Sequence, residues 1–343
     1  MKHLLNTLFV TSSDIYLSLD GENVVAKKEN AIVARYPLHT LGNIVTFSYS
    51  GASPALMGAC AEREIAMAFC SPRGKFLARI CGDNCGNVIL RREQYRIADD
   101  EERACRIAVN MLIGKLYNSR WSIERTARDH AMRVDVQRLK SASSAIAALS
   151  QELESQLSFE HLRGVEGVAA TEYFGVLDEM ILNEDESFRF STRNRRPPLD
   201  AVNAMLSFAY SLLSHDCAAA LECNGLDSYV GFLHRDRAGR ASLALDLMEE
   251  LRPCMADRFV LTMINNRRIK GSDFIFEESG CVRLTDDGRR SFLSAWQEKK
   301  REMIKHPYLD ERIEWGMVPH VQALLLVRHI RGDIDGYPPF LWK

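Results

Sequence analysis

The 343-residue sequence contains no apolar run that approaches the roughly 18 to 20 residues of a membrane span. Its opening segment, MKHLLNTLFVTSSD, carries one lysine and too short an apolar stretch for a secretory signal. Repeats, low-complexity tracts and long Gly/Pro/Ser linkers are also missing. These absences predict a cytoplasmic protein that does not enter a membrane.

An excess of positive charge is missing too, because 44 Lys and Arg face 46 Asp and Glu, for a formal net charge of -2. Any site for a polyanion must therefore be a local patch. Among the nine cysteines, Cys81 and Cys85 frame a CGDNC loop, but no second closely spaced pair completes a zinc site. The odd number and the lack of a signal predict reduced thiols.

The hydrophobic pattern changes near residue 98. Short alternating runs before it predict strands, with one short helix at 52–62, and apolar residues at every third or fourth position after it predict helices. We therefore expect an α+β fold, with a small N-terminal β-sheet domain (1–97) and a large all-helical C-terminal catalytic domain (98–343). The expected strands are 15–20, 23–29, 31–37, 43–48, 65–70 and 75–80, and the expected later helices are about 135–158, 164–184, 199–215, 242–264 and 284–304.

One candidate functional residue is an acid in a segment of small and apolar residues. In GVEGVAATEYFGVLDEM (164–180), Glu166 stands between Val165 and Gly167. An ionised carboxylate in such a setting needs a cation or a hydrogen-bond partner, or it stays protonated. The alternative is an exposed acid near a helix N-terminus, where negative charge is favourable. The local sequence leaves both interpretations open.

A histidine and several acids lie close together in GLDSYVGFLHRDRAGRASLALDLMEELRP (225–253). His234 ends an apolar run, while Asp246, Glu249 and Glu250 fall off the apolar stripe of the helix that follows. An imidazole with carboxylates is an oxygen-rich donor set that suits Mg²⁺ or Mn²⁺. The alternative is a turn histidine beside a solvated acidic face.

Arginines gather in FRFSTRNRRPPLDAVNAMLSFAY (188–210), where Arg193, Arg195 and Arg196 precede two prolines. The prolines predict a loop that opens a helix at Leu199. Guanidinium groups beside a helix N-terminus suit phosphodiester contacts. A plain surface loop explains the pattern equally well.

Taken together, these segments match a family pattern. In order they read GxEGxAAxxYF, RxRRPPxDxxNAxLSFxY and GLDxYxGFLHxxRxGRxSLxLDLMEExRP, followed by ADRFVLTMIN. The chain resembles the integrase of the CRISPR spacer-acquisition (adaptation) machinery, and the third segment resembles its subtype I-C branch. The likeness covers about residues 160–275 closely and the rest loosely.

The resemblance implies a β-sandwich-like N-terminal domain that forms a homodimer and a helical domain that carries the active site. It implies that Glu166, His234 and Glu249 bind Mg²⁺ or Mn²⁺ and are the catalytic residues, with Asp246 as an auxiliary acid. It also implies a small ferredoxin-like partner protein that bridges two dimers.

The implied reaction is the insertion of a short foreign DNA fragment into a CRISPR array. A 3′-hydroxyl of the fragment attacks a phosphodiester of the repeat, so the enzyme is a metal-dependent DNA endonuclease and integrase. Residues that we expect to hold double-stranded DNA are Arg193, Arg195, Arg196, Arg237 and Arg240. Two alternatives remain, a metal-dependent nuclease that hydrolyses branched or single-stranded DNA and a non-catalytic DNA-binding scaffold.

Overall fold

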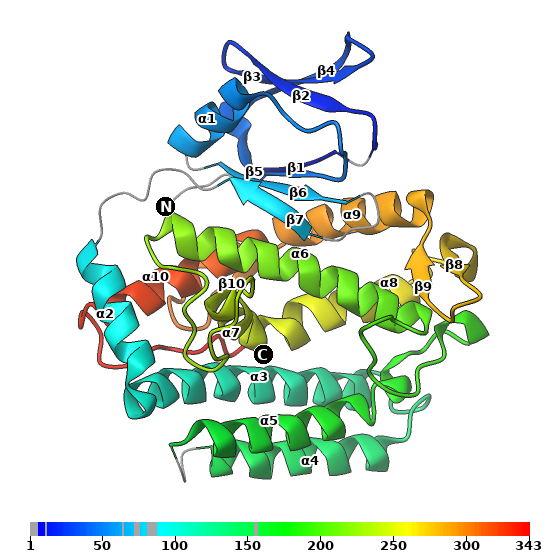
Figure 1. Cartoon of the computed structure of the whole chain (residues 1–343). Helices are drawn as coiled ribbons and strands as arrows, with labels where there is room; N and C mark the ends of the chain where they lie inside the picture. The colour runs from blue at the N-terminus through cyan, green and yellow to red at the C-terminus, as the bar shows by residue number, and fades with distance from the viewer. Residues whose placement is uncertain (1–5, 11, 64, 72–75, 81–87, 154–156) are drawn as a thin grey trace. The chain divides into compact units, whose positions relative to one another are not determined.

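The computed structural model describes residues 6–10, 12–63, 65–71, 76–80, 88–153 and 157–343. The chain divides into two compact units. One comprises Met1–Gly86 with Phe292–Glu302, and the other comprises Asn87–Ser291 with Met303–Lys343. The fold class is confirmed, because strands dominate the N-terminal part and helices the rest (Figure 1).

In its described residues, the N-terminal unit contains two small sheets, one short helix and most of the later helix α9 (Asp286–Arg301). Strands β2, β3 and β4 form an antiparallel sheet, and β1, β5, β6 and β7 form a mixed one in that order. Strand β1 pairs in parallel with β5, and β7 closes the edge antiparallel to β6. The bounds are β1 Asn6–Val10, β2 Tyr16–Asp20, β3 Asn23–Lys28, β4 Ala31–Pro37, β5 Leu41–Thr46, α1 Pro54–Glu62, β6 Ala66–Cys70 and β7 Phe76–Ile80.

The core of this unit draws on both sheets and on α1. Leu17 and Val24 from one sheet, Ile44 and Met67 from the other and Leu56 from α1 are fully buried in one cluster. Alternation along the strands places these residues on inner faces, as the sequence pattern predicts. All six predicted strands and the helix are confirmed, whereas β1 was not anticipated because its short apolar run was considered only as a signal segment.

The helical unit is built around α3, which contacts α4, α5, α7 and the segment after α7. Asp100 caps α3 through a hydrogen bond from the Arg103 backbone N–H at 3.1 Å. The helices are α2 Val88–Asp99, α3 Glu101–Asp129, α4 Val136–Glu152, α5 Phe159–Phe174, α6 Ala201–Cys223, α7 Ser242–Leu251, α8 Arg258–Asn265, α9 Asp286–Arg301 and α10 Val318–Ile330.

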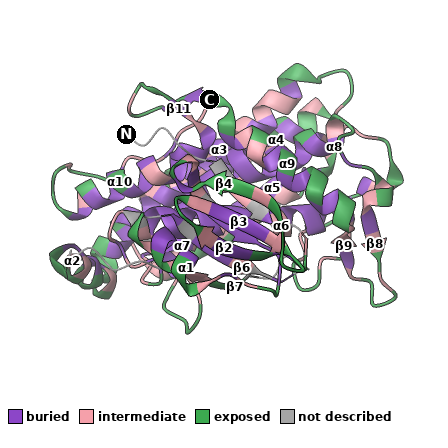
Figure 2. Ribbon diagram, turned by 90° about the horizontal axis from the view of Figure 1, so that it is seen from above, coloured by how far each residue is buried: buried purple, intermediate pink, exposed green. Residues whose placement is uncertain are grey.

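A close approach of the two backbones fixes α7 against α3. A Cβ at Gly114 of α3 would lie 2.8 Å from the Glu250 Cβ of α7, so only glycine permits this spacing. Nearly all of α7 is buried (Figure 2). A π-helical segment, Arg252–Asp257, then links α7 to α8. Helix α7 is therefore held in place inside the helical unit.

Some features of the helical part differ from the expectation. It also contains two β-hairpins, β8 (Phe274–Phe276) with β9 (Val282–Leu284) and β10 (Met303–Lys305) with β11 (Arg312–Glu314). Helix α2 spans residues 97 and 98, so the predicted domain boundary there stays a prediction. The Cys81–Cys85 loop lies outside the described residues. No helix in the described part of the chain is long and apolar enough to cross a membrane.

Candidate active site

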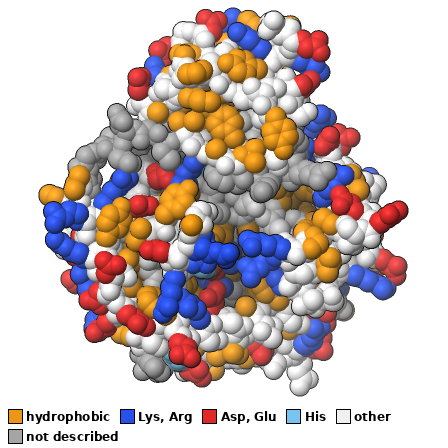
Figure 3. All heavy atoms as spheres, viewed as in Figure 1, with side chains coloured by type: hydrophobic (Ala, Val, Ile, Leu, Met, Phe, Trp, Pro, Cys, Tyr) orange, Lys and Arg blue, Asp and Glu red, His pale blue; other side chains and the backbone are white. Residues whose placement is uncertain are grey.

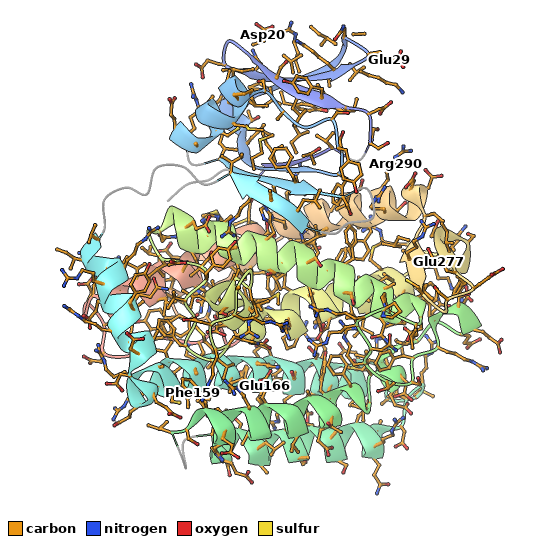
Figure 4. The ribbon with its side chains drawn as sticks, in the orientation of Figure 1. Asp20, Glu29, Phe159, Glu166, Glu277 and Arg290 are labelled. Atoms are coloured by element: carbon orange, nitrogen blue, oxygen red, sulfur yellow. The ribbon has the colours of Figure 1, made fainter. Side chains whose placement is uncertain are left out.

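A lysine that the sequence analysis did not single out lies at the centre of the candidate site. The Nζ of Lys115, on α3, lies 2.6 Å from Glu166 Oε1 on α5 and 2.8 Å from Glu249 Oε2 on α7. The Lys115 side chain is 13% exposed, that of Glu166 is 22% exposed and that of Glu249 is fully buried. Three helices therefore bring two predicted site acids to one cation. Glu166 lies on α5 beside α3 in Figure 4.

The Glu249 carboxylate is ionised although it is buried. Burial alone would raise its pKa, but the charges of Arg252 and Lys115 outweigh burial and lower the pKa to about 2. Arg252 Nη1 lies 3.0 Å from Glu249 Oε1. Among the residues that the structure describes, no donor makes a well-directed hydrogen bond to either carboxylate oxygen of Glu249. Glu249 thus has the charge of a metal ligand and spare acceptor capacity.

His234 is oriented by Asp246. The Nδ1 atom of His234 lies 2.6 Å from Asp246 Oδ1, which leaves Nε2 as the ring nitrogen that can bind a ligand. Burial opposes a charged imidazole, but the hydrogen bond and charge of Asp246, followed by the charges of Glu249 and Glu166, raise the pKa of His234. A ring nitrogen held by a carboxylate is the usual arrangement behind a metal-binding histidine.

The loop that carries His234 is wrapped around the same aspartate. Asp246 accepts hydrogen bonds from the backbone N–H groups of Phe232 at 2.6 Å, Leu233 at 2.9 Å and His234 at 3.0 Å. A Cβ at Gly231 would lie 2.7 Å from Asp246 Oδ2, so glycine is required there. Asp246 therefore determines both the conformation of this loop and the orientation of the His234 ring.

Asp246, Glu249 and Glu250 are all fully buried, so the solvated acidic face that the sequence left open is wrong. Glu250 points away from Glu249's partners, toward the C-terminal segment. It accepts hydrogen bonds from Gln322 Nε2 at 2.9 Å, from the Phe340 backbone N–H at 2.7 Å and from the Tyr337 hydroxyl. Burial raises the pKa of Glu250 to about 7 despite these three donors. Glu250 therefore holds the chain end in place.

The donor set of this site fits a divalent metal. In the part of the chain that the structure describes, no three His, Cys, Asp or Glu side chains converge closely enough to hold a metal as they stand. The Lys115 ammonium lies between two of the predicted ligands. The ionised oxygens of Glu249, the Glu166 carboxylate and the oriented His234 ring are nevertheless donors that Mg²⁺ and Mn²⁺ accept.

The predicted DNA-binding arginines fall into two groups. Arg193 donates to Asn203 Oδ1 at 2.6 Å and to Ser207 Oγ at 3.2 Å, and burial lowers its pKa. Arg240 donates to Ser242 Oγ at 3.3 Å and to the backbone carbonyl of Arg235. These two therefore hold local structure. The other three, Arg195, Arg196 and Arg237, are exposed.

Further basic side chains lie near α5. The guanidinium groups of Arg163 and Arg235 lie 5.8 Å and 5.6 Å from the centroid of the Phe159 ring. Both arginines are exposed, and Phe159 is half-buried. Lys and Arg side chains gather over the middle of the helical unit (Figure 3). A polyanion can therefore approach this face, although the whole chain is nearly neutral.

One family of known proteins matches most of the chain. The family model described as CRISPR associated protein Cas1 matches residues 8–298. The CRISPR-associated endonuclease Cas1 1 of Chlorobaculum tepidum is 46% identical over 343 residues, which cover 100% of both chains. The chain belongs to the Cas1 family.

Solved structures show that the Cas1 fold extends over nearly the whole chain. A casposase bound to integration product aligns with a TM-score of 0.83 and 22% identity, covering 98% of this chain and 93% of that one. A chain of a Cas6-RT-Cas1--Cas2 complex aligns with a TM-score of 0.82 and 23% identity, covering 100% of this chain and 36% of that one. At such identities the likeness concerns the fold.

Membership of the Cas1 family does not by itself identify Lys115 or Arg252, which the sequence analysis missed. A signal for Lys115 was present, because it shares a face of α3 with Leu112 and Ser119, both buried. A lysine on an apolar face needs a buried partner. Arg252 offered a weaker signal, namely its position one helical turn after Glu249.

Proposed function

We propose that this Cas1-family protein is a metal-dependent DNA integrase that inserts short foreign DNA fragments into a CRISPR array. The observation that carries the proposal is the convergence of Glu166 and Glu249 on the Lys115 ammonium. Asp246 holds the ring of His234, and the charges of Glu249 and Glu166 help to raise the pKa of this histidine. The names of the relatives support the proposal. The Chlorobaculum tepidum relative is called an endonuclease, and the aligned casposase is bound to an integration product.

The proposed reaction exchanges one phosphodiester for another. The 3′-oxygen of the captured fragment forms a bond to phosphorus, the bond to the 3′-oxygen of the repeat strand breaks, and the proton of the attacking hydroxyl passes to solvent or to the leaving oxygen. No nucleotide cofactor is consumed. Mg²⁺ or Mn²⁺, held by Glu166, Glu249 and His234, would supply Lewis-acid stabilisation of the charge that develops around phosphorus.

The chain's own residues position the reacting groups. Asp246 fixes the His234 ring so that Nε2 is available, and the buried pair Glu249–Arg252 keeps a negative charge in place without rearrangement. Arg195, Arg196 and Arg237, with Arg163 and Arg235 near Phe159, are the exposed cations that we propose to bind DNA phosphates. Arg193 and Arg240 support the loops that carry them.

The remaining parts of the proposal concern partners. A solved relative of the same fold occurs in a Cas6-RT-Cas1--Cas2 complex, and this supports a small protein partner for the present chain. We propose that the partner is ferredoxin-like and bridges two homodimers, that the protein acts in the cytoplasm, and that it belongs to subtype I-C. A mass measurement of the purified protein with and without the partner tests the assembly. Separate masses in the mixture would contradict it.

The reaction itself is tested with a fluorescent DNA duplex and a supercoiled plasmid that carries the repeat. The purified protein, with and without its partner, is incubated in Mg²⁺, in Mn²⁺ or in a chelator. We expect the fluorescent strand to become joined to the plasmid in either metal and not in the chelator. Nicked plasmid without joined label would instead establish a hydrolytic nuclease, and DNA binding without either product would establish a scaffold.

A further inference from the structure

The two ion pairs that Lys115 and Arg252 form with Glu166 and Glu249 balance in charge without any added ion. The two cations Lys115 and Arg252 face the two carboxylates of Glu166 and Glu249, and all four side chains are less than a quarter exposed. The contacts are direct, at 2.6, 2.8 and 3.0 Å. A divalent cation added to this set would leave two uncompensated positive charges in a poorly solvated place, which is costly.

Lys115 also takes up the space that a metal needs. Its ammonium contacts one oxygen of each acid, and these are the two carboxylates that would have to turn toward a metal such as Mg²⁺ at about 2.0 to 2.1 Å. A lysine ammonium is a point charge on a flexible four-carbon stem, so it can leave one acceptor and reach another nearby. A phosphodiester in the site would be such an acceptor, and it would also bring one negative charge that offsets part of the excess.

We infer that Lys115 is the counter-ion of the metal site in the free protein. Its ammonium competes with the divalent ion for Glu166 and Glu249 until DNA enters. In the free protein the ammonium holds Glu166 and Glu249 together. When a phosphodiester arrives, Lys115 turns to its oxygens and the two carboxylates become available to the metal. Metal binding and DNA binding are therefore coupled, and each strengthens the other. This inference rests on the proposed function, because it requires the same two acids to be metal ligands.

The test is a titration of the full-length protein with Mn²⁺, in which electron paramagnetic resonance measures the concentration of the free ion. The titration is carried out without DNA and with a short DNA duplex. Lys115→Met removes the competing charge, and we expect it to bind Mn²⁺ at least roughly tenfold more tightly than the wild type without DNA. Lys115→Arg keeps the charge and should bind no more tightly than the wild type. With DNA present, the wild type should approach the affinity of Lys115→Met.

The matched control is Lys140→Met, which removes an exposed lysine paired with Glu124 in the same helical unit. It should leave Mn²⁺ affinity unchanged. Because Lys115→Met leaves a buried acid short of one partner, its melting temperature is measured as well. We expect Mn²⁺ to raise the melting temperature of this variant more than that of the wild type.

The outcomes separate the two levels of the argument. Equal or weaker Mn²⁺ binding by Lys115→Met would overturn the counter-ion role and leave metal-dependent joining intact. If Glu166→Gln, the wild type and Lys115→Met all fail to bind Mn²⁺ with and without DNA, the proposed metal site is itself wrong.

Discussion

Replacing Asp246 by asparagine should both destabilise the helical unit and impair joining. Asp246 is fully buried and accepts three backbone N–H groups and the His234 ring. The amide of asparagine has one oxygen and one NH₂ group, so in either orientation at least one backbone donor faces another donor. Such a buried, unpaired donor costs about 1–3 kcal/mol, and the loss of the charged acceptor weakens the remaining bonds. We expect a total loss of about 3 kcal/mol.

For a unit of this size, that loss corresponds to a melting temperature lower by roughly 6 to 12 °C. The assay is urea unfolding followed by circular dichroism, together with a thermal melt. Asp236→Asn is the control, because Asp236 is exposed in the same loop and the substitution changes the same charge. Its unfolding free energy should stay within about 0.5 kcal/mol of the wild type.

The effect on function follows from the orientation of His234. Loss of a carboxylate behind a metal-binding histidine typically costs about 10 to 100-fold in metal affinity or activity, so joining should fall by that factor at a temperature where the variant is folded. An Asp246→Asn protein that melts and joins DNA like Asp236→Asn would refute the reasoning, because it would show that the loop and ring do not depend on this acid.

Two other substitutions test the scaffold around the site. Burial raises the pKa of Asp257 to about 6 from the usual aspartate value of 3.8, although the Tyr210 hydroxyl donates a hydrogen bond to it at 2.6 Å. The folded state therefore binds a proton that the unfolded state has lost between about pH 4 and 6, so this group lowers stability as the pH rises. In urea unfolding, the free energy of unfolding of Asp257→Asn should rise by up to about 3 kcal/mol relative to that of the wild type between pH 4 and 7. A difference between the two proteins that does not change with pH would contradict the burial effect. Asn118→Ala removes the hydrogen bonds that Asn118 Nδ2 donates to the backbone carbonyls of Glu250 and Phe340, both at 2.7 Å. Amide hydrogen exchange in the last residues of the chain should therefore accelerate at least tenfold. Unchanged exchange would show that other contacts hold this segment.

Much of the fold was predictable because its periodicity is local. Alternation predicted the strands from β2 to β7, and the change of period indicated the change from strands to helices. Helix ends were less accurate where tertiary contacts decide them. The predicted helix at 164–184 begins instead at Phe159, because Ser158 caps it, and it ends at Phe174. The helix predicted at 242–264 is interrupted by the π-helical segment, which no periodic pattern indicates.

The site was predictable only in part, for a different physical reason. Glu166, His234 and Glu249 were predicted as site residues from their motifs, and the structure brings Glu166 and Glu249 to one ammonium. Lys115 comes from a helix far away in the sequence, so only the packing of α3 against α5 and α7 reveals it. Arg193 is the opposite case, because this residue of a basic loop donates hydrogen bonds within the unit, and its contact with DNA stays a prediction.

The most direct test of the central claim is DNA joining by three single variants of the candidate ligands, Glu166→Gln, His234→Asn and Glu249→Gln. Glu160→Gln, an exposed acid on the first turn of α5, is the matched control. All four proteins are first shown to be folded by circular dichroism. We predict that the control joins a labelled duplex to the repeat plasmid like the wild type, whereas the three ligand variants give no joined product. Joining at the wild-type rate by any one of the three would contradict the account.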